Sequence, residues 1–147
     1  MYMTSDVFID SSILVEYIKG SKTQLLNSLI IQPQFMAYVN ETVVSEFFLY
    51  FLAVNGGAAP RTIKSAEKIG EIFESHSNYS LIKHFAFLSN DEKLIAAVPS
   101  IMAKYNLLPN DAIILATCKI HGITRLASHD TDFKIPCQQE GIELLTE

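Results

Sequence analysis

The hydrophobic pattern alternates between two spacings along the chain. Residues 7–9 are three consecutive apolar residues that lead to Asp10, and apolar residues then recur three and four positions apart over residues 13–18. A continuous apolar run is typical of a strand buried on both faces, whereas the wider spacing is typical of a helix with one buried face. The pattern therefore predicts a strand that ends at Asp10 and a helix that follows at once.

The rest of the chain repeats this alternation. Further strands are expected over three segments: residues 35–39, 123–127 and 142–145. Helices are expected over five segments: residues 22–31, 41–52, 60–75, 91–105 and 112–121. Residues 79–88 leave a strand open, Pro99 should kink or split its helix, and residues 128–133 should form a polar loop. Strands that alternate with helices predict an α/β domain whose largely parallel sheet is covered on both sides.

Length and composition narrow the class of protein. The 147 residues suit one domain, long enough to bury about 70% of the surface of its unfolded form. Hydrophobic residues make up 49% of the chain and charged residues 18%, so part of the apolar surface is expected to meet a partner. No apolar run has the length that spans a bilayer and no signal peptide is recognised, so a cytoplasmic protein is expected.

Net charge does not exclude a nucleic-acid substrate, and cysteine spacing gives no sign of a cysteine metal site. The formal charge of −5 is unlike the broad basic surface of many nucleic-acid-binding proteins. A cluster of acids that holds divalent cations would account for much of this charge, so its sign does not exclude a nucleic-acid substrate. Cys118 and Cys137 lack the spacing of metal ligands and are expected to be reduced and structural.

Acids recur where predicted strands end or predicted helices begin. The candidates are Asp10, Glu46, Asp111, Asp130 and Asp132. Each also fits an ordinary role on its own: Asp111 as an acid at a helix start, Glu46 as a solvated helix position, and Asp130 as a turn residue. Asp10 differs in position, because the carboxyl end of a strand is where open α/β sheets bind their ligands.

Together these acids indicate a metal site. Two carboxylates about 4 Å apart repel by roughly 4 kcal/mol at an effective dielectric of 20, so acids that share a pocket need a proton or a cation. Ligands that are all oxygen suit Mg²⁺ or Mn²⁺, whereas zinc prefers the histidines and cysteines that this chain does not cluster. Such ions commonly activate water for attack on phosphorus.

Four segments resemble, in order and spacing, the four acidic motifs of the PIN-domain nucleases. They are residues 7–12 (VFIDSS), Ser45 with Glu46, residues 108–117 (LPNDAIILAT) and residues 126–133 (LASHDTDF). The chain looks most like the small VapC-type ribonuclease toxins of bacterial and archaeal toxin–antitoxin pairs, and the resemblance covers nearly its whole length. It implies a PIN-like three-layer α/β/α sandwich with a largely parallel central sheet, formed by one domain over residues 1–147.

The resemblance also implies roles for individual residues. The acidic pocket would be formed by Asp10, Glu46, Asp111 and Asp130. Asp10 and Asp111 would be direct ligands of Mg²⁺ or Mn²⁺, and Asp130 would complete the site. Ser12 matches the hydroxyl position that steadies the first acid. Ser128 stands where the family often has threonine, a substitution that should keep the hydrogen bond of the hydroxyl.

Two of these assignments have rivals within the sequence. Asp130 and Asp132 lie in the same short segment, and we favour Asp130 as the fourth acid with Asp132 as an outer ligand. Glu41 lies five residues before Glu46, which turns its side chain well round the predicted helix. Glu41 is therefore expected to face solvent.

The expected function is metal-dependent endoribonuclease activity. Glu46 would position or deprotonate the attacking water, and the family implies products with a 3′-hydroxyl and a 5′-phosphate. A cognate antitoxin would cover the pocket, and surplus aromatic residues over 47–51 make a homodimer another expected partner. One alternative is a catalytically silent PIN-like domain that binds RNA or acts as a scaffold. A receiver-type phosphoacceptor domain fits less well, because it expects paired acids after the first strand and a lysine after the last.

Overall fold

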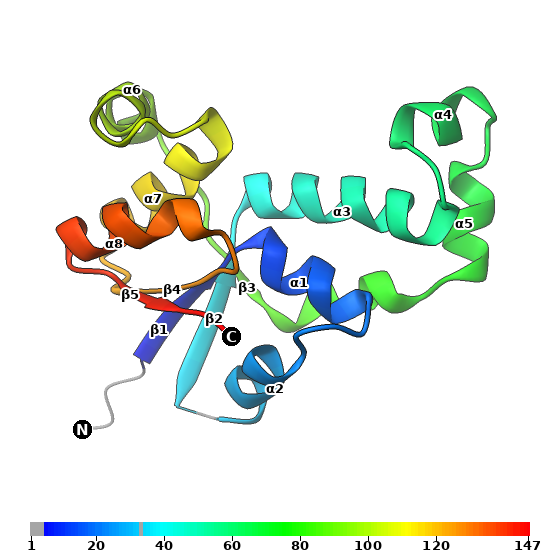
Figure 1. The fold of residues 1–147 in the computed structure, drawn as a ribbon, viewed down its shortest axis with the longest axis horizontal. Coiled ribbons are helices and arrows are strands. Elements are labelled where there is room, and N and C mark those ends of the chain that lie inside the picture. Colours follow the sequence, from blue (N-terminus) through cyan, green and yellow to red (C-terminus); the bar gives the residue numbers. More distant parts are fainter. Residues whose placement is uncertain (1–4, 33) are drawn as a thin grey trace.

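A parallel sheet organises the fold. The structure, a computed structural model, describes residues 5–32 and 34–147. Within these residues, five strands lie in the order β3-β2-β1-β4-β5, and every neighbouring pair is parallel (Figure 1). The strands are β1 (Ser5–Ile9), β2 (Phe35–Val39), β3 (Ala86–Phe87), β4 (Arg125–Ala127) and β5 (Glu143–Leu145). The α/β prediction with a largely parallel sheet is confirmed.

Strand β1 lies at the centre of the sheet. Its residues Val7, Phe8 and Ile9 are 0% exposed, as expected for a strand covered on both faces. Phe8 is in register with Tyr38 of β2 on one side and with Leu126 of β4 on the other. The apolar run over residues 7–9 therefore forms part of the central strand, and Asp10 follows the carboxyl end of that strand.

Helices cover both faces of the sheet, as the three-layer prediction requires. They are α1 (Ser11–Ile18), α2 (Gln24–Ile31), α3 (Glu41–Gly56), α4 (Pro60–Ser65), α5 (Ile69–Ser75), α6 (Lys93–Tyr105), α7 (Pro109–His121) and α8 (Lys134–Glu140), with 3₁₀ turns at η1 (Asn78–His84) and η2 (Thr131–Phe133). Figure 1 shows α6, α7 and α8 on one side and α1 and α2 on the other. None of the described helices is both long and apolar enough to span a bilayer.

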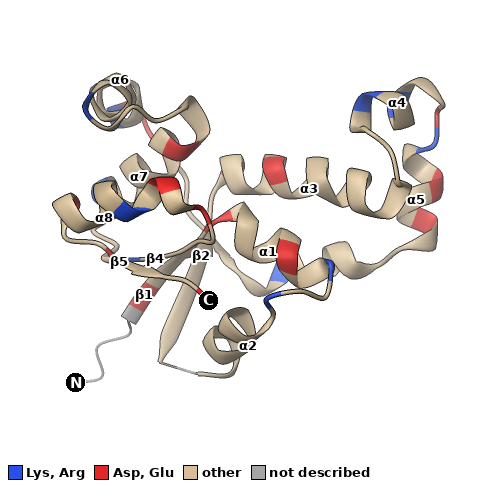
Figure 2. Cartoon of the chain, viewed as in Figure 1, with Lys and Arg blue, Asp and Glu red and all other residues tan. Residues whose placement is uncertain are grey.

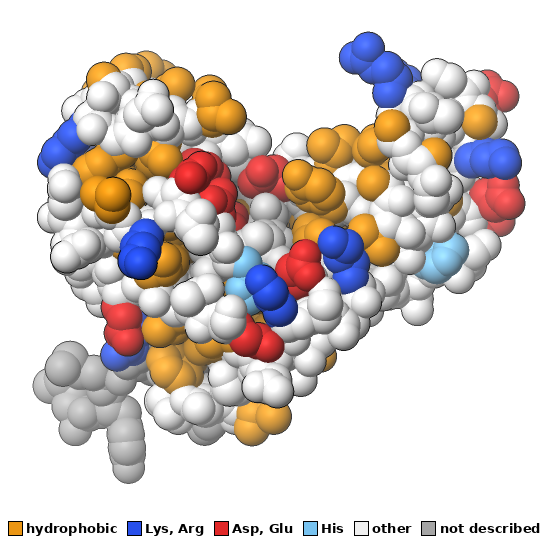
Figure 3. Space-filling model, viewed as in Figure 1, with side chains coloured by type: hydrophobic (Ala, Val, Ile, Leu, Met, Phe, Trp, Pro, Cys, Tyr) orange, Lys and Arg blue, Asp and Glu red, His pale blue; other side chains and the backbone are white. Residues whose placement is uncertain are grey.

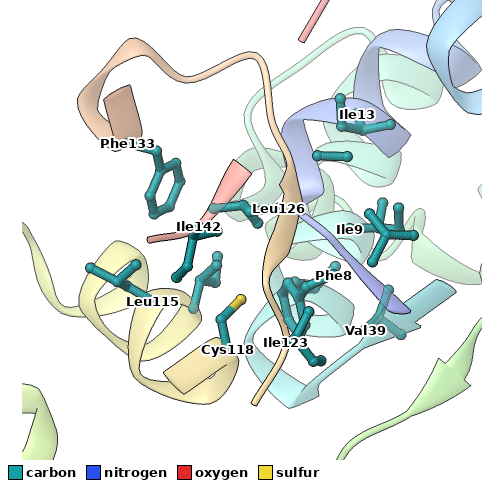
Figure 4. Close-up of a cluster of buried hydrophobic side chains, with 14 of the residues drawn as sticks. Phe8, Ile9, Ile13, Val39, Leu115, Cys118, Ile123, Leu126, Phe133 and Ile142 are labelled. Carbon is teal, nitrogen blue, oxygen red and sulfur yellow. The ribbon is translucent and has the colours of Figure 1, made fainter. Parts of the chain in front are cut away.

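The main core joins these layers. Leu115 and Cys118 of α7 are fully buried on one face of the sheet, close to Leu126 (Figure 4). Ile9 and Ile13 lie on the other side of β4 in the same view. Cys118 is a free thiol within this apolar cluster, and burial raises its pKa far above the ordinary value of a thiol, so it behaves as a small core residue.

The prediction of one helix over residues 60–75 is wrong. The segment forms two short helices, α4 and α5, and Glu67 between them has a left-handed backbone with φ 56°. Ile63 of α4 and Ile72 of α5 are both buried in one cluster with Phe51, in the second half of α3. The chain turns at Glu67 because one straight helix could not direct both isoleucines to the same aromatic side chain.

Other local predictions also differ from the structure. Pro99 does not divide α6, which runs without interruption from Lys93 to Tyr105 and packs along α7. The expected polar loop over residues 128–133 contains the 3₁₀ turn η2, and Phe133 within it is fully buried. Helix α8 was not predicted; its Pro136 lies in the first turn, where a missing N–H costs little.

Candidate active site

Two of the predicted acids come from neighbouring strands. Asp10 follows β1, and Asp130 follows β4 after Ser128 and one further residue. The strands are parallel and paired, and the Asp10 N–H donates to the carbonyl of Ala127 at 3.0 Å. Because the carboxyl ends of parallel strands meet at one edge of a sheet, the two acids are brought to the same place.

The other two acids come from helices tied together by a buried amide. Asn40 is 0% exposed; its side-chain oxygen accepts from the Val43 N–H at 3.0 Å and so caps α3, which carries Glu46. Its Nδ2 donates to Oγ1 of Thr117 at 3.0 Å in α7, the helix that carries Asp111 in its first turn. This hydrogen bond fixes the start of α3 against α7, so Glu46 and Asp111 approach the same opening.

The four predicted acids line one cavity. Asp10, Glu46, Asp111 and Asp130 are all on the wall of a hollow of about 490 Å³. Figure 2 shows acidic positions at the end of β1, on α3, on α7 and in the segment before α8. In Figure 3 the same opening is a hollow edged by acidic side chains. Glu41, the sequence rival of Glu46, is exposed as expected and does not line the hollow.

Asp10 is held by two hydroxyls. Its side chain is only 4% exposed, and its Oδ2 accepts from Ser12 at 2.7 Å and from Ser128 at 2.6 Å. The Ser12 oxygen accepts in turn from the His129 N–H, and the Ser128 oxygen from the Asp130 N–H, both at 3.0 Å. Because each serine oxygen accepts from a backbone N–H, its one hydroxyl proton remains available to donate to Asp10. These two hydrogen bonds offset part of the cost of burying the Asp10 charge.

Three carboxylates come close enough to share a cation. In the described part of the chain, one oxygen atom from each of Asp111, Asp130 and Asp132 lies within 4.8 Å of the others. Asp130 is also oriented by its neighbour, because its Oδ1 accepts from the Asp132 N–H at 2.9 Å. From the sequence, Asp130 and Asp132 were alternative candidates for the fourth acid, but both lie beside Asp111 in the structure. Asp10 lines the same cavity and is not a member of this trio.

The crowding of negative charge is visible in the pKa of Asp111. Burial, followed by the charges of Asp130 and Asp10, raises the pKa of this carboxyl from 3.8 to about 7. The pKa of Glu46 is raised as well, first by burial and then by Asp10, although hydrogen bonds from Asn110 and Ser11 oppose the shift. Near neutral pH the cavity therefore takes up protons or cations readily.

The donor atoms fit a hard divalent ion. The cavity offers carboxylate and hydroxyl oxygens, which are the ligands that Mg²⁺ and Mn²⁺ prefer. Cys118 and Cys137 are buried free thiols that do not line it. The donor set therefore suits either of these two ions better than zinc.

Part of the cavity wall was not predicted from the sequence. Tyr50 and Val54 of α3 line it, as do Glu16 of α1 and Lys19 just after that helix. None of these four residues was among the predicted site residues. A signal was present in the spacing, since Tyr50 lies four residues after Glu46 and therefore on the same face of the helix. That spacing becomes informative once the cavity between α1 and α3 is known.

Comparisons with known proteins identify the family of this chain. The family model described as PIN domain matches residues 7–138. Ribonuclease VapC6 from Methanocaldococcus jannaschii is 34% identical over 142 residues, which cover 88% of this chain and 92% of that protein.

Solved structures share the fold at low sequence identity. VapBC2 from Rickettsia felis, bound to a DNA fragment from their promoter, superposes with a TM-score of 0.62 at 12% identity and covers 97% of this chain and 98% of that one. A toxin–antitoxin complex from Klebsiella pneumoniae has a TM-score of 0.53 at 19% identity, with 95% and 96% covered. With its parallel sheet, its acidic cavity and a family match over most of its length, the chain belongs to the PIN-domain family.

Proposed function

We propose that this protein is a Mg²⁺- or Mn²⁺-dependent endoribonuclease and the toxin of a toxin–antitoxin pair. The observation that carries the proposal is the convergence of Asp10, Glu46, Asp111 and Asp130 on one cavity. Kinship with ribonuclease VapC6 supports RNA as the substrate. A ribonuclease toxin acts on cellular RNA, which favours a cytoplasmic location.

The acids are assigned complementary parts in this proposal. Asp10, Asp111 and Asp130 would hold the ion, with Asp132 as a further ligand beside Asp111. When bound, the ion supplies Lewis-acid activation of water and neutralises charge on the phosphate. Ser12 and Ser128 hold the Asp10 carboxylate in one orientation by donating to the same oxygen.

Glu46 is proposed as the group that positions the attacking water and accepts its proton. Its pKa is raised by burial and by the charge of Asp10, which brings the carboxylate closer to the pKa that suits a general base near neutral pH. The Ser11 hydroxyl donates to its Oε1 at 3.4 Å and limits its rotation. Attack of water at phosphorus, with departure of the 3′-oxygen, would leave a 3′-hydroxyl and a 5′-phosphate.

Two protein partners belong to the proposal. A cognate antitoxin is supported by the toxin–antitoxin complexes among the solved structures of this fold. It would inhibit by covering the cavity, with a basic side chain placed among the acids. A homodimer is supported by the exposed apolar side chain of Leu49 on α3, which is 54% exposed and lies outside the cavity.

The test is cleavage of a mixed RNA pool in Mg²⁺, Mn²⁺ or EDTA. We expect cleavage with either ion and none in EDTA. Asp10→Asn and Asp111→Asn should each lower the rate on the order of 10²-fold or more, since each removes a charged ligand. Glu41→Gln is the matched control, because this exposed acid of α3 does not line the cavity.

Each outcome of this assay supports a different function for the protein. Cleavage that persists in EDTA, or Asp→Asn variants as active as the parent, would reject the metal-dependent mechanism. RNA binding without cleavage under any ion condition would instead favour the silent PIN-like domain. Mapping of the product ends with a kinase that requires a free 5′-hydroxyl distinguishes the proposed products from those with a 5′-hydroxyl.

A further inference from the structure

The cavity extends beyond the acids into a space between α1 and α3. Its wall on α3 is a row of residues four positions apart: Glu46, Tyr50 and Val54. The opposite wall contains Val15 and Glu16 of α1 and Lys19, the residue that follows α1. Residues at such spacings share one face of a helix. Figure 3 shows apolar side chains of α3 beside the acidic hollow, with a basic side chain nearby over α1.

Tyr50 presents its ring to this space. Its side chain is 48% exposed, whereas the neighbouring rings of Phe47, Phe48 and Phe51 pack against other aromatic rings. Among the described residues, Tyr50 belongs to none of these aromatic pairs. The ring is therefore free to stack against a flat ligand next to the acidic pocket.

Lys19 supplies a positive charge at the far end of the same wall. Of the described residues that line the cavity, it is the one lysine, and no arginine accompanies it. Its Nζ lies 3.3 Å from Oε1 of Glu16, and its side chain is 48% exposed. Lys19 lies nine positions after Asp10, which corresponds to about 14 Å along a helix axis. Lys19 is thus placed to meet a phosphate beyond the one at the acids.

We propose that this space is a subsite for the nucleotide next to the scissile phosphate, with its base stacked on Tyr50 and a backbone phosphate bound by Lys19. The inference rests on the proposed function. A strand whose scissile phosphate lies among the acids must continue along an adjoining wall, and an aromatic ring beside a cation is how proteins hold single strands. An apolar protein segment would instead bury the Lys19 ammonium without a new partner, at a cost in free energy.

The test measures steady-state cleavage of a labelled single-stranded RNA in Mn²⁺. Stacking of one base contributes enough affinity that Tyr50→Ala should raise KM roughly tenfold or more, with a smaller change in kcat. Tyr50→Phe keeps the ring and should behave like the parent. Ile95→Ala is the control for loss of an exposed apolar side chain, because Ile95 of α6 is 77% exposed and does not line the cavity. Thermal melts verify that all variants are folded.

Lys19 is tested through salt dependence, which a purely structural role would not change. Lys19→Gln should raise KM and reduce the slope of log affinity against log salt by about 0.7, as expected for one phosphate contact with a single strand. Lys83→Gln, an exposed lysine of η1 away from the cavity, should leave the slope unchanged.

The possible failures are distinguishable. If the parent cleaves RNA but Tyr50→Ala and Lys19→Gln retain its KM and salt slope, the subsite is refuted and the space is left to a protein ligand such as the antitoxin. If Tyr50→Phe loses as much as Tyr50→Ala, the hydroxyl matters and stacking is refuted. If the parent does not cleave RNA with any ion, the proposed function itself fails, and the subsite fails with it.

Discussion

Replacing Asp111 by asparagine should make the metal-free protein more stable and should weaken the stabilisation that a bound metal ion gives. The pKa of Asp111 is raised from 3.8 to about 7 by burial and by neighbouring carboxylates. A difference of about three pKa units corresponds to about 4 kcal/mol, which partial solvent exposure of the side chain reduces to about 1–2 kcal/mol. In EDTA at pH 8, Asp111→Asn should therefore be more stable than the parent by this amount.

The sign of the pH dependence follows from the same shift. A carboxyl whose pKa is higher in the folded state binds its proton more tightly when folded. Its contribution to stability is present in full below about pH 4 and is lost as the pH rises through about 7. The metal-free parent should thus lose stability between pH 5 and pH 8, and Asp111→Asn should lose less.

Bound metal should stabilise the parent more than Asp111→Asn. An ion at a concentration of 100 times its dissociation constant stabilises the folded protein by about 2.7 kcal/mol. For a chain of this length each kcal/mol raises Tm by about 2–4 °C, so Mn²⁺ should raise the Tm of the parent by roughly 5–10 °C. Asp111→Asn lacks one charged ligand and should gain much less.

Differential scanning fluorimetry at pH 8, with EDTA or with a series of Mn²⁺ concentrations, measures these effects. Glu74→Gln is the control, because it removes an exposed acid of α5 that does not line the cavity. If Asp111→Asn is no more stable than the parent in EDTA, or gains as much from Mn²⁺, the Asp111 carboxylate neither destabilises the metal-free protein nor binds the ion.

Two further substitutions test the supports of the site. Asn40→Ala removes the cap of α3 and the hydrogen bond to Thr117, and it should lower the free energy of unfolding by about 1–3 kcal/mol; a loss below about 0.5 kcal/mol in urea denaturation would contradict this role. Ser128→Ala removes a donor to Asp10 and should lower kcat for RNA cleavage about tenfold to a hundredfold, whereas Ser128→Thr should keep most of the activity. Equal kcat in the alanine and threonine variants would show that this hydroxyl does not support catalysis.

The sequence was most informative where local pattern and topology agree. Residues 7–9 followed by Asp10 could be interpreted without tertiary information, because a buried parallel strand and an acid at its carboxyl end both follow from residue type. The same reasoning placed Asp130 after a second strand. Asp10 and Asp130 then meet because β1 and β4 are neighbours in the sheet.

The sequence was less informative where packing over long distances decides the structure. The turn at Glu67 depends on two isoleucines that share one phenylalanine of α3, and no local pattern records that contact. The walls formed by Tyr50 and Lys19 depend on how α1 lies beside α3. The placement of both Asp130 and Asp132 beside Asp111 likewise depends on the conformation of η2 and could not be resolved from spacing.

The most direct test of the metal site is anomalous scattering from crystals grown with Mn²⁺. We expect a strong anomalous peak among the carboxylates of Asp10, Asp111 and Asp130, with oxygen ligands at about the distances usual for hard divalent ions. The peak should be absent from crystals of Asp111→Asn or greatly reduced in them. If crystals of the parent grown with Mn²⁺ show no anomalous peak in this cavity, or show their strongest peak elsewhere, these acids do not form the metal site.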